Sequence, residues 1–187
     1  MRKLIVFNSI SLDGYFVDPK GDMSWAHNSS PEFDAFVEEN AKGGGVLLFG
    51  RKTYDLMASF WPTSMAAQAY PVVAERMNNL PKVVFSRTMD KPQWNNTRVV
   101  KGDIVAATRK MKQESEAGMA IMGSGSIVSQ LVQEGLIDEY QVVVIPVILG
   151  SGRTMFEGVK ERLRLKLIKS RIFGNGNVFL CYEPAEK

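Results

Sequence analysis

The order of apolar and polar positions along the chain predicts strands that alternate with helices. Short apolar runs bounded by glycines or turn residues are typical of buried strands. They occur at residues 4–10, 46–49, 82–85, 98–100 and 119–122. Amphipathic segments with a helical period lie between most of these runs. This alternation predicts an α/β fold whose sheet consists mostly of parallel strands.

The last third of the chain has a different pattern. Residues 140–149 are β-branched and apolar on both faces, which is typical of a strand inside a sheet. Residues 163–173 alternate apolar and charged positions, as a strand does. Residues 174–177 are typical of a hairpin turn, and residues 178–182 form the returning strand. The chain therefore begins as α/β and ends in an antiparallel hairpin.

A helix is predicted to begin at Ser30 and Pro31, because serine is a common N-cap and proline a common first helical residue. Its buried stripe consists of Phe33, Phe36, Val37 and Ala41. Asp34 falls at the edge of this stripe, where we expect apolar neighbours to desolvate its carboxyl group and favour the neutral acid. A first-turn carboxylate also interacts favourably with the helix dipole. Asp34 is thus either a helix-stabilising residue or a candidate proton donor.

A turn with almost no side chains is predicted after the run 119–122. Its residues are Gly123, Ser124, Gly125 and Ser126, and Ile127 follows as the start of an amphipathic helix. A glycine turn before a helix presents free N–H groups and the positive end of the dipole, which favour an anion such as phosphate. The dinucleotide fingerprint would need a third glycine at Val128. The stretch is therefore a phosphate loop of another fold or a plain tight turn.

Two further polar clusters follow predicted strands. Gly50, Arg51, Lys52 and Thr53 open a helix, and Ser86, Arg87 and Thr88 follow the run 82–85. Cations at a helix N-terminus oppose the dipole, so a bound phosphate would explain the first cluster, and solvated side chains are the alternative. A guanidinium between two hydroxyls suits a phosphomonoester, although a plain polar loop has the same composition.

Composition narrows the class of protein. The 187 residues are 45% hydrophobic and 23% charged, which suits one domain spanning residues 1–187 with one core. The formal charge of +3 comes without long Lys/Arg runs, so no nucleic-acid partner is expected.

Few residues are available for metal or nucleophilic chemistry. Cys181 is the only cysteine and His27 the only histidine, so we expect no disulfide, no metal site and no hydrolytic triad. The sequence has no signal-peptide core and no membrane-length apolar span, and we expect a cytoplasmic protein that binds no membrane.

Five short motifs occur in chain order at predicted strand ends. They are Ser11-x-Asp13-Gly14, Gly50-Arg51-x-Thr53, Phe85-Ser86-Arg87, Gly123-x-Gly125, and Pro146-x-x-Leu149-Gly150-x-Gly152 with Phe156. Together they resemble the dihydrofolate reductase superfamily, in the branch that contains the riboflavin-biosynthesis reductase domain of bifunctional deaminase-reductases. The resemblance implies a three-layer α/β/α fold with a central mixed, mostly parallel sheet and a C-terminal antiparallel hairpin.

The resemblance also implies NADPH as cofactor and assigns site residues. Its phosphates would lie near Gly50, Arg51, Lys52 and Thr53, its adenosine 2′-phosphate near Ser86 and Arg87, and its pyrophosphate within Gly123, Ser124, Gly125, Ser126 and Ile127. Asp34 would be the catalytic carboxylate, and Asn8, Ser11, Asp13 and Gly14 would contact the substrate. The glycines are expected to let the pyrophosphate approach the backbone.

These residues predict an NADPH-dependent reductase that passes hydride to a C=N or C=O bond of a small heterocycle. The leading substrate is the phosphoribosylamino-pyrimidine of riboflavin synthesis, and dihydrofolate or another pterin is the alternative. A non-catalytic NADPH-binding or sensor protein is the alternative of another class. The deaminase motifs are absent, and Trp25 is farther from Asp34 than in folate reductases. The late hairpin and residues 142–148 weakly suggest a homodimer.

Overall fold

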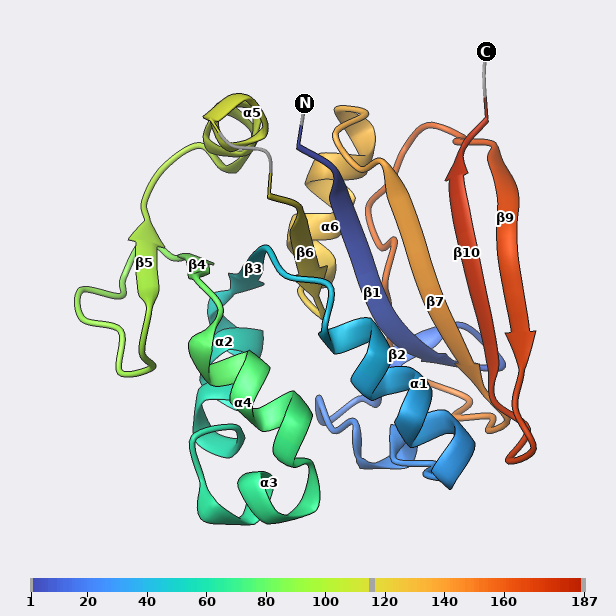
Figure 1. The fold of residues 1–187 in the computed structure, drawn as a ribbon. Coiled ribbons are helices and arrows are strands. Elements are labelled where there is room, and N and C mark those ends of the chain that lie inside the picture. The colour runs from blue at the N-terminus through green and yellow to red at the C-terminus, as the bar shows by residue number, and fades with distance from the viewer. Residues whose placement is uncertain (1, 115–116, 186–187) are drawn as a thin grey trace.

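The computed structural model describes residues 2–114 and 117–185. Within them lies an eight-stranded sheet with the order β5-β4-β3-β6-β1-β7-β10-β9 (Figure 1). In that order the strands are β5 (Thr97–Val100), β4 (Lys82–Phe85), β3 (Val46–Gly50), β6 (Met119–Met122), β1 (Leu4–Ser11), β7 (Glu139–Ile145), β10 (Val178–Pro184) and β9 (Leu165–Ile172). All neighbours from β5 to β7 pair in parallel. Strands β7, β10 and β9 pair antiparallel, which confirms the mixed sheet and the C-terminal hairpin.

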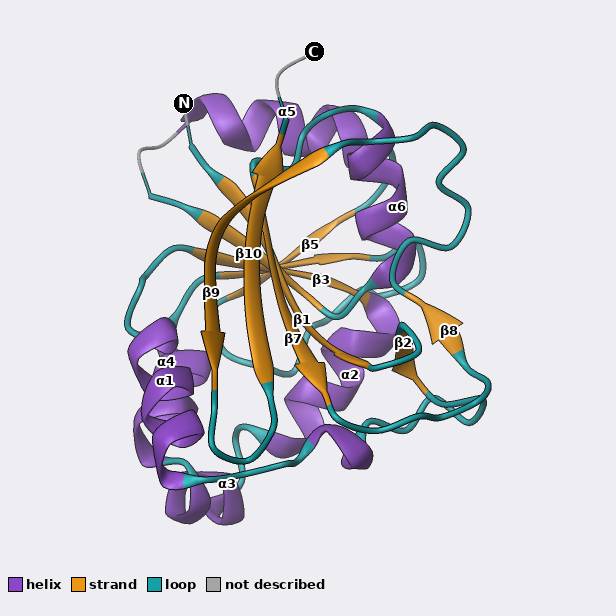
Figure 2. Cartoon of the chain, turned by 90° about the vertical axis from the view of Figure 1, so that its right-hand side faces the viewer, coloured by secondary structure: helices purple, strands orange, loops and turns teal. Residues whose placement is uncertain are grey.

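Helices cover both faces of the sheet (Figure 2). One face carries α1 (Pro31–Ala41), α2 (Arg51–Phe60) and α4 (Pro71–Asn79), with α3 (Ser64–Ala69) beside α4. The other face carries α5 (Ile104–Glu114) and α6 (Gly125–Gln133). None of the helices in the described ranges is long and apolar enough to cross a membrane.

The alternation of side chains along β1 explains how the two faces form separate cores. Leu4 and Val6 are fully buried against α6, in a cluster that includes Val128 and Leu131. Phe7 points to the opposite face and packs with the aromatic cluster of α1. A strand that is buried on both faces needs this continuous apolar sequence, because successive side chains point to opposite faces.

Most predicted boundaries agree with the structure. Ser30 is the N-cap of α1, and its hydroxyl accepts a hydrogen bond from the Phe33 N–H at 3.3 Å. The strand predicted at residues 140–149 extends too far, since β7 ends at Ile145. Pro146 follows it and has no N–H to continue the ladder.

Three short elements were not predicted. They are α3, a 3-10 turn at Ser24–Ala26, and a two-stranded sheet of β2 (Tyr15–Val17) and β8 (Arg153–Thr154). Each is too short to show a hydrophobic period. The small sheet joins segments that are far apart in sequence, and it lies beside the amino end of α6 (Figure 2).

Candidate cofactor and substrate site

Two helices begin at neighbouring strand ends. Gly50 is the last residue of β3 and the N-cap of α2, and Ser124 is the N-cap of α6 just after β6. Because β3 and β6 are parallel neighbours, both helix N-termini lie at the same edge of the sheet. The structure thus brings together the two predicted phosphate loops, at the edge where open α/β sheets bind ligands.

Hydrogen bonds join the two loops directly. The backbone N–H of Ser124 donates to Thr53 Oγ1 at 3.1 Å, and the backbone N–H of Gly50 donates to Ser124 Oγ at 2.9 Å. Ser124 itself has a left-handed backbone with φ 58°. The hydroxyls of Thr53 and Ser124 therefore hold the loops in register.

Asn8 fixes the first glycine of the α6 loop. Its Oδ1 accepts from the Gly123 N–H at 2.6 Å, and its Nδ2 donates to the Gly123 carbonyl at 3.2 Å. The side chain is 3% exposed and its Nδ2 also lies 2.9 Å from Met155 Sδ. We predicted Asn8 at the substrate. In the structure its amide holds both backbone groups of Gly123, and a contact with the substrate stays a prediction.

The two glycines of the loop are needed for contacts within the protein. A Cβ at Gly123, where φ is 59°, would lie 2.8 Å from Thr53 Cγ2. A Cβ at Gly125 would lie 3.0 Å from the ring of Phe16. A valine at position 125 would therefore disturb packing whether or not a ligand approaches, and it cannot isolate cofactor binding.

The N–H groups of the first turn of α6 remain available. The Ser124 carbonyl accepts from the N–H of Ile127 and of Val128, which leaves Gly125 and Ser126 with the orphan N–H groups of the helix start. Gly125 lies under Phe16, whereas Ser126 is exposed. The side of α6 at Ser126 is thus open to an anion.

The predicted cations lie at the same edge of the sheet. Arg51 and Lys52 are exposed in the first turn of α2, and Arg51 Nε donates to Asp55 Oδ2 at 2.6 Å. Ser86 and Arg87 follow β4, the parallel neighbour of β3. Ser86 Oγ accepts from the N–H of Thr88 and of Met89, while Arg87 is exposed. Helix dipoles and exposed cations together make this edge attractive to phosphate.

The first and last sequence motifs form one joint. Ser11 is buried, and its Oγ accepts from the Tyr15 N–H at 2.9 Å. The carboxylate of Asp13 accepts from the N–H groups of Leu149 and Gly150 at 3.1 and 2.7 Å. The Ser11 hydroxyl, and then these N–H groups, hold the pKa of Asp13 below its usual range. Gly14, with φ 89°, completes the turn. In the structure these predicted substrate residues anchor the loop after β7.

Asp34 lies in the first turn of α1. This helix crosses from the carboxyl end of β1 to the amino end of β3, so its first turn is on the same side of the molecule as Gly50 and Gly123 (Figure 1). Asp34 is half-buried, on a helix whose Phe33 and Phe36 are buried. Its Oδ2 accepts a hydrogen bond from the exposed Ser29 hydroxyl at 2.6 Å. The carboxylate therefore has one polar partner and is partly shielded from water.

The family is identified by comparison with known sequences. The sequence profile of the RibD C-terminal domain matches residues 2–179. The chain belongs to this family. A relative is the uncharacterized protein YyaP of Bacillus subtilis (strain 168), which is 26% identical over 182 residues, with 97% of this chain and 94% of the relative covered.

Solved structures agree with the assignment to the RibD C-terminal domain family. A putative riboflavin biosynthesis protein from Shewanella sp. PV-4 has a TM-score of 0.75 at 26% identity, covering 98% of this chain and 99% of that one. The dihydrofolate reductase from Enterococcus faecalis complexed with NADP(H) has a TM-score of 0.67 at 16% identity, with 98% and 97% covered, and so shares the fold. The predicted family and fold are confirmed.

In this RibD C-terminal domain, sequence reasoning missed the residues that fasten α1. Asn28 Nδ2 donates to Asn177 Oδ1 at 2.8 Å and to the Asn175 carbonyl at 3.0 Å, and Asn177 is fully buried. Glu32 accepts from Arg171 and from the Gly174 N–H at 2.9 and 3.3 Å. The turn between β9 and β10 thus holds the start of α1. The sequence signal for these contacts was three asparagines, Asn28, Asn175 and Asn177. We interpreted the last two only as residues of the hairpin turn.

Proposed function

We propose that this RibD C-terminal domain is an NADPH-dependent reductase that passes hydride to a C=N or C=O bond of a small heterocyclic substrate. The observation that carries the proposal is the junction of two helix N-termini at Gly50 and Gly123, joined through Thr53 and Ser124. Membership in a reductase family supports a reductase role. The cofactor and the substrate are our proposals.

The residues at this junction fit a dinucleotide phosphate. The orphan N–H groups of α2 and α6 and the exposed cations Arg51 and Lys52 would bind the pyrophosphate. Ser86 and Arg87 would bind the adenosine 2′-phosphate at the end of β4. When bound, the nicotinamide supplies the hydride, and the protein contributes binding, orientation and a proton source.

Asp34 is our candidate for that proton source. It lies on the same side of the molecule as the phosphate junction, and Ser29 orients its carboxyl group through the 2.6 Å hydrogen bond. A half-buried carboxyl with one polar partner can exchange a proton with a substrate nitrogen or oxygen. Asn8, Ser11, Asp13 and Gly14 would then shape the substrate site through the loops that they hold.

The leading substrate is a phosphoribosylamino-pyrimidine of riboflavin synthesis, and dihydrofolate or another pterin is the alternative. The Shewanella neighbour is described as a putative riboflavin biosynthesis protein, which supports the first. A non-catalytic NADPH-binding or sensor protein is the alternative of another class. The organisation as one domain over residues 1–187 and the cytoplasmic location stay predictions.

A homodimer through the last hairpin also stays a proposal, which the exposure of β9 supports. This edge strand exposes Leu167, Ile168 and Ile172. A long edge strand with apolar side chains is a template for pairing with another strand. Pairing with a second copy would cover it.

The test is to mix the purified protein with NADPH and candidate acceptors and to follow the loss of NADPH absorbance. We expect oxidation with one acceptor class, weaker NADPH binding in Lys52→Ala, and unchanged binding in Lys110→Ala, which removes an exposed lysine on α5. NADPH binding without oxidation by any acceptor would favour the sensor. A protein that does not bind NADPH would overturn the proposal.

A further inference from the structure

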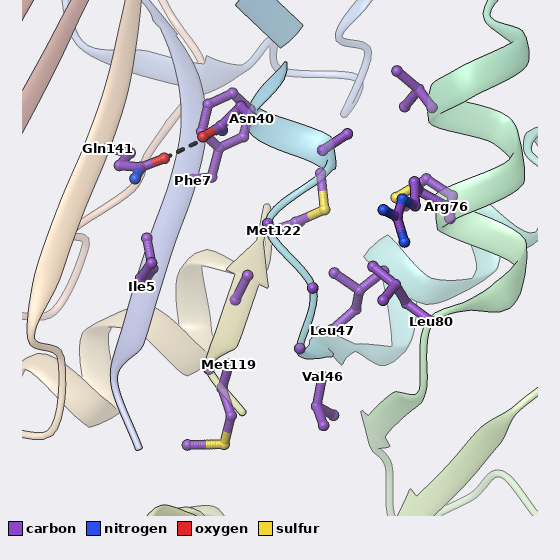
Figure 3. Close-up of a pocket in the computed structure, with 18 of the residues that line it drawn as sticks. Ile5, Phe7, Asn40, Val46, Leu47, Arg76, Leu80, Met119, Met122 and Gln141 are labelled. Atoms are coloured by element: carbon purple, nitrogen blue, oxygen red, sulfur yellow. Dashed lines mark hydrogen bonds between the residues drawn. The ribbon is translucent and has the colours of Figure 1, made fainter. Parts of the chain in front are cut away.

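A pocket of about 210 Å³ lies on the sheet face that carries α1 and α4 (Figure 3). It covers the amino-terminal halves of β1 and β3 and the length of β6 up to Met122, the residue before Gly123. None of the predicted cofactor or substrate residues lines it. The volume is several times the ~30 Å³ that one water molecule occupies in the liquid, so an aromatic ring fits.

The walls of the pocket are apolar. Ile5 and Phe7 of β1, Leu47 of β3 and Met122 of β6 form one side, and Val37 of α1 and Leu80 after α4 form the other. Water gains few hydrogen bonds in such a space, and its lining atoms lack the contacts of a packed core. An apolar guest would restore those contacts.

Small residues keep the pocket open. Ala41 ends α1 and Ala120 is in the middle of β6, so neither fills the space between helix and sheet. Gly45 has φ 136°, and a Cβ there would lie 2.3 Å from the Gly118 carbonyl oxygen. The close approach of these two chain segments excludes a side chain at position 45.

One cation faces this apolar space. Arg76 is in the last turn of α4, and Figure 3 shows its guanidinium extending from the helix toward the pocket. Among residues 2–114 and 117–185 it has no carboxylate at ion-pair distance. On the opposite side, Asn40 Nδ2 donates to Gln141 Oε1 at 3.2 Å and closes the gap between α1 and β7.

We propose that this pocket binds a small, flat monocarboxylate with an apolar body, such as an aromatic acid. The ring would fill the space beside Phe7 and Met122, and the carboxylate would take the two-pronged hydrogen bond of Arg76. A single cation matches a single negative charge and not a phosphate dianion. The site is separate from the proposed reductase site and needs no cofactor.

The test uses cinnamate and its uncharged analogue cinnamamide, titrated into the cofactor-free protein by calorimetry. Arg76→Gln should weaken cinnamate binding by roughly tenfold or more, the loss of a charged hydrogen bond. It should leave cinnamamide binding unchanged. Arg162→Gln, which removes an exposed arginine outside both proposed sites, is the matched control and should change neither affinity.

A second variant tests the location of the ring. Ala41→Leu adds a side chain into the pocket from the last residue of α1 and should abolish binding of both compounds at unchanged melting temperature. Absence of cinnamate binding to the wild-type protein, or equal binding in Arg76→Gln, would overturn the proposal. Methyl NMR shifts of Met122 on adding cinnamate provide a readout that needs no variant, and unchanged shifts would also overturn it. Because NADPH is absent throughout, the result is independent of the proposed reductase activity.

Discussion

The two ends of the proposed active site are held in different ways. At the phosphate end, the contacts are buried or part-buried. Asn8 bonds both buried backbone groups of Gly123, and Ser124 makes part-buried bonds with Thr53 and Gly50. A buried donor that loses its partner pays its full desolvation cost. These loops therefore have one well-defined geometry before a ligand arrives.

At the α1 end, the contacts are partly or fully exposed. Ser29 bonds Asp34 at the surface, and Glu32 bonds Arg171 and Gly174 at the surface. Water can replace such partners at low cost. The comparison teaches that the protein is preorganised where we place the cofactor and adjustable where we place the substrate. Four predictions follow from this difference, in decreasing order of expected effect.

The largest effect is expected from Asp34→Asn. If Asp34 supplies a proton, turnover should drop about 10²–10⁴-fold, roughly 3–5 kcal/mol in the barrier, because the amide keeps the shape and removes the acid. NADPH affinity should stay the same. Single-turnover kinetics with the identified acceptor would measure the drop, and Glu39→Gln, which alters an exposed carboxylate of the same helix, is the control. An unchanged rate would leave Asp34 as a helix-stabilising residue only.

Asn8→Ala should have the next largest effect. It leaves the buried N–H and carbonyl of Gly123 without partners, which should cost about 2–3 kcal/mol of unfolding free energy and weaken NADPH binding. Asn28→Ala removes hydrogen bonds that are only part-buried, so its cost should be smaller, about 1 kcal/mol. Urea denaturation of both variants would compare the two regions. Equal losses of unfolding free energy in the two variants would contradict the proposed difference between the two regions.

Arg87→Ala should affect cofactor choice. If Arg87 contacts the 2′-phosphate, NADPH binding should weaken by about 1–3 kcal/mol, the range of a charged hydrogen bond, and NADH binding should change little. Calorimetric titration of both cofactors would measure this. The same loss for NADH and NADPH would place Arg87 elsewhere.

The smallest effect is expected at acid pH, where the contacts of Glu32 with the hairpin turn should weaken. The hydrogen bond from Arg171, followed by that from the Gly174 N–H, lowers the pKa of Glu32. A lowered folded-state pKa means that the contact stabilises the native state above the unfolded-state pKa and is lost as the pH falls through the folded-state pKa. Amide exchange at Gly174 should therefore accelerate in that acid range. Glu32→Gln should remove the pH dependence, and a persisting one would implicate another group.

Local sequence signals predicted much of the fold. The N-cap at Ser30 and the glycine turns at strand ends act within a few residues, so they can be read directly. The shared edge of the phosphate loops follows from parallel pairing, which the α/β alternation already indicated. These features explain why the positions of both loops could be predicted.

The contacts that hold the site could not be read in the same way. Asn8 and Gly123 are 115 residues apart, and Asp13 and Leu149 are 136 apart. A polar side chain near a strand end looks the same in sequence whether it meets a ligand or a distant backbone group. The resemblance placed Asn8 and Asp13 at the substrate, and in the structure their side chains also hold loops. Whether those loops contact the substrate stays a prediction.

The position of β1 has a consequence for synthesis on the ribosome. This first strand is flanked by β6 and β7, and its Leu4 N–H bonds Asp138, 134 residues later in the chain. Until those segments have been translated, β1 lacks both of its strand partners, and Leu4 and Val6 lack the cover of α6. Pairing between segments that are far apart in sequence forms late and slows folding. The nascent chain thus carries an unpaired apolar strand for most of its synthesis, and during that time it is a natural target for chaperones.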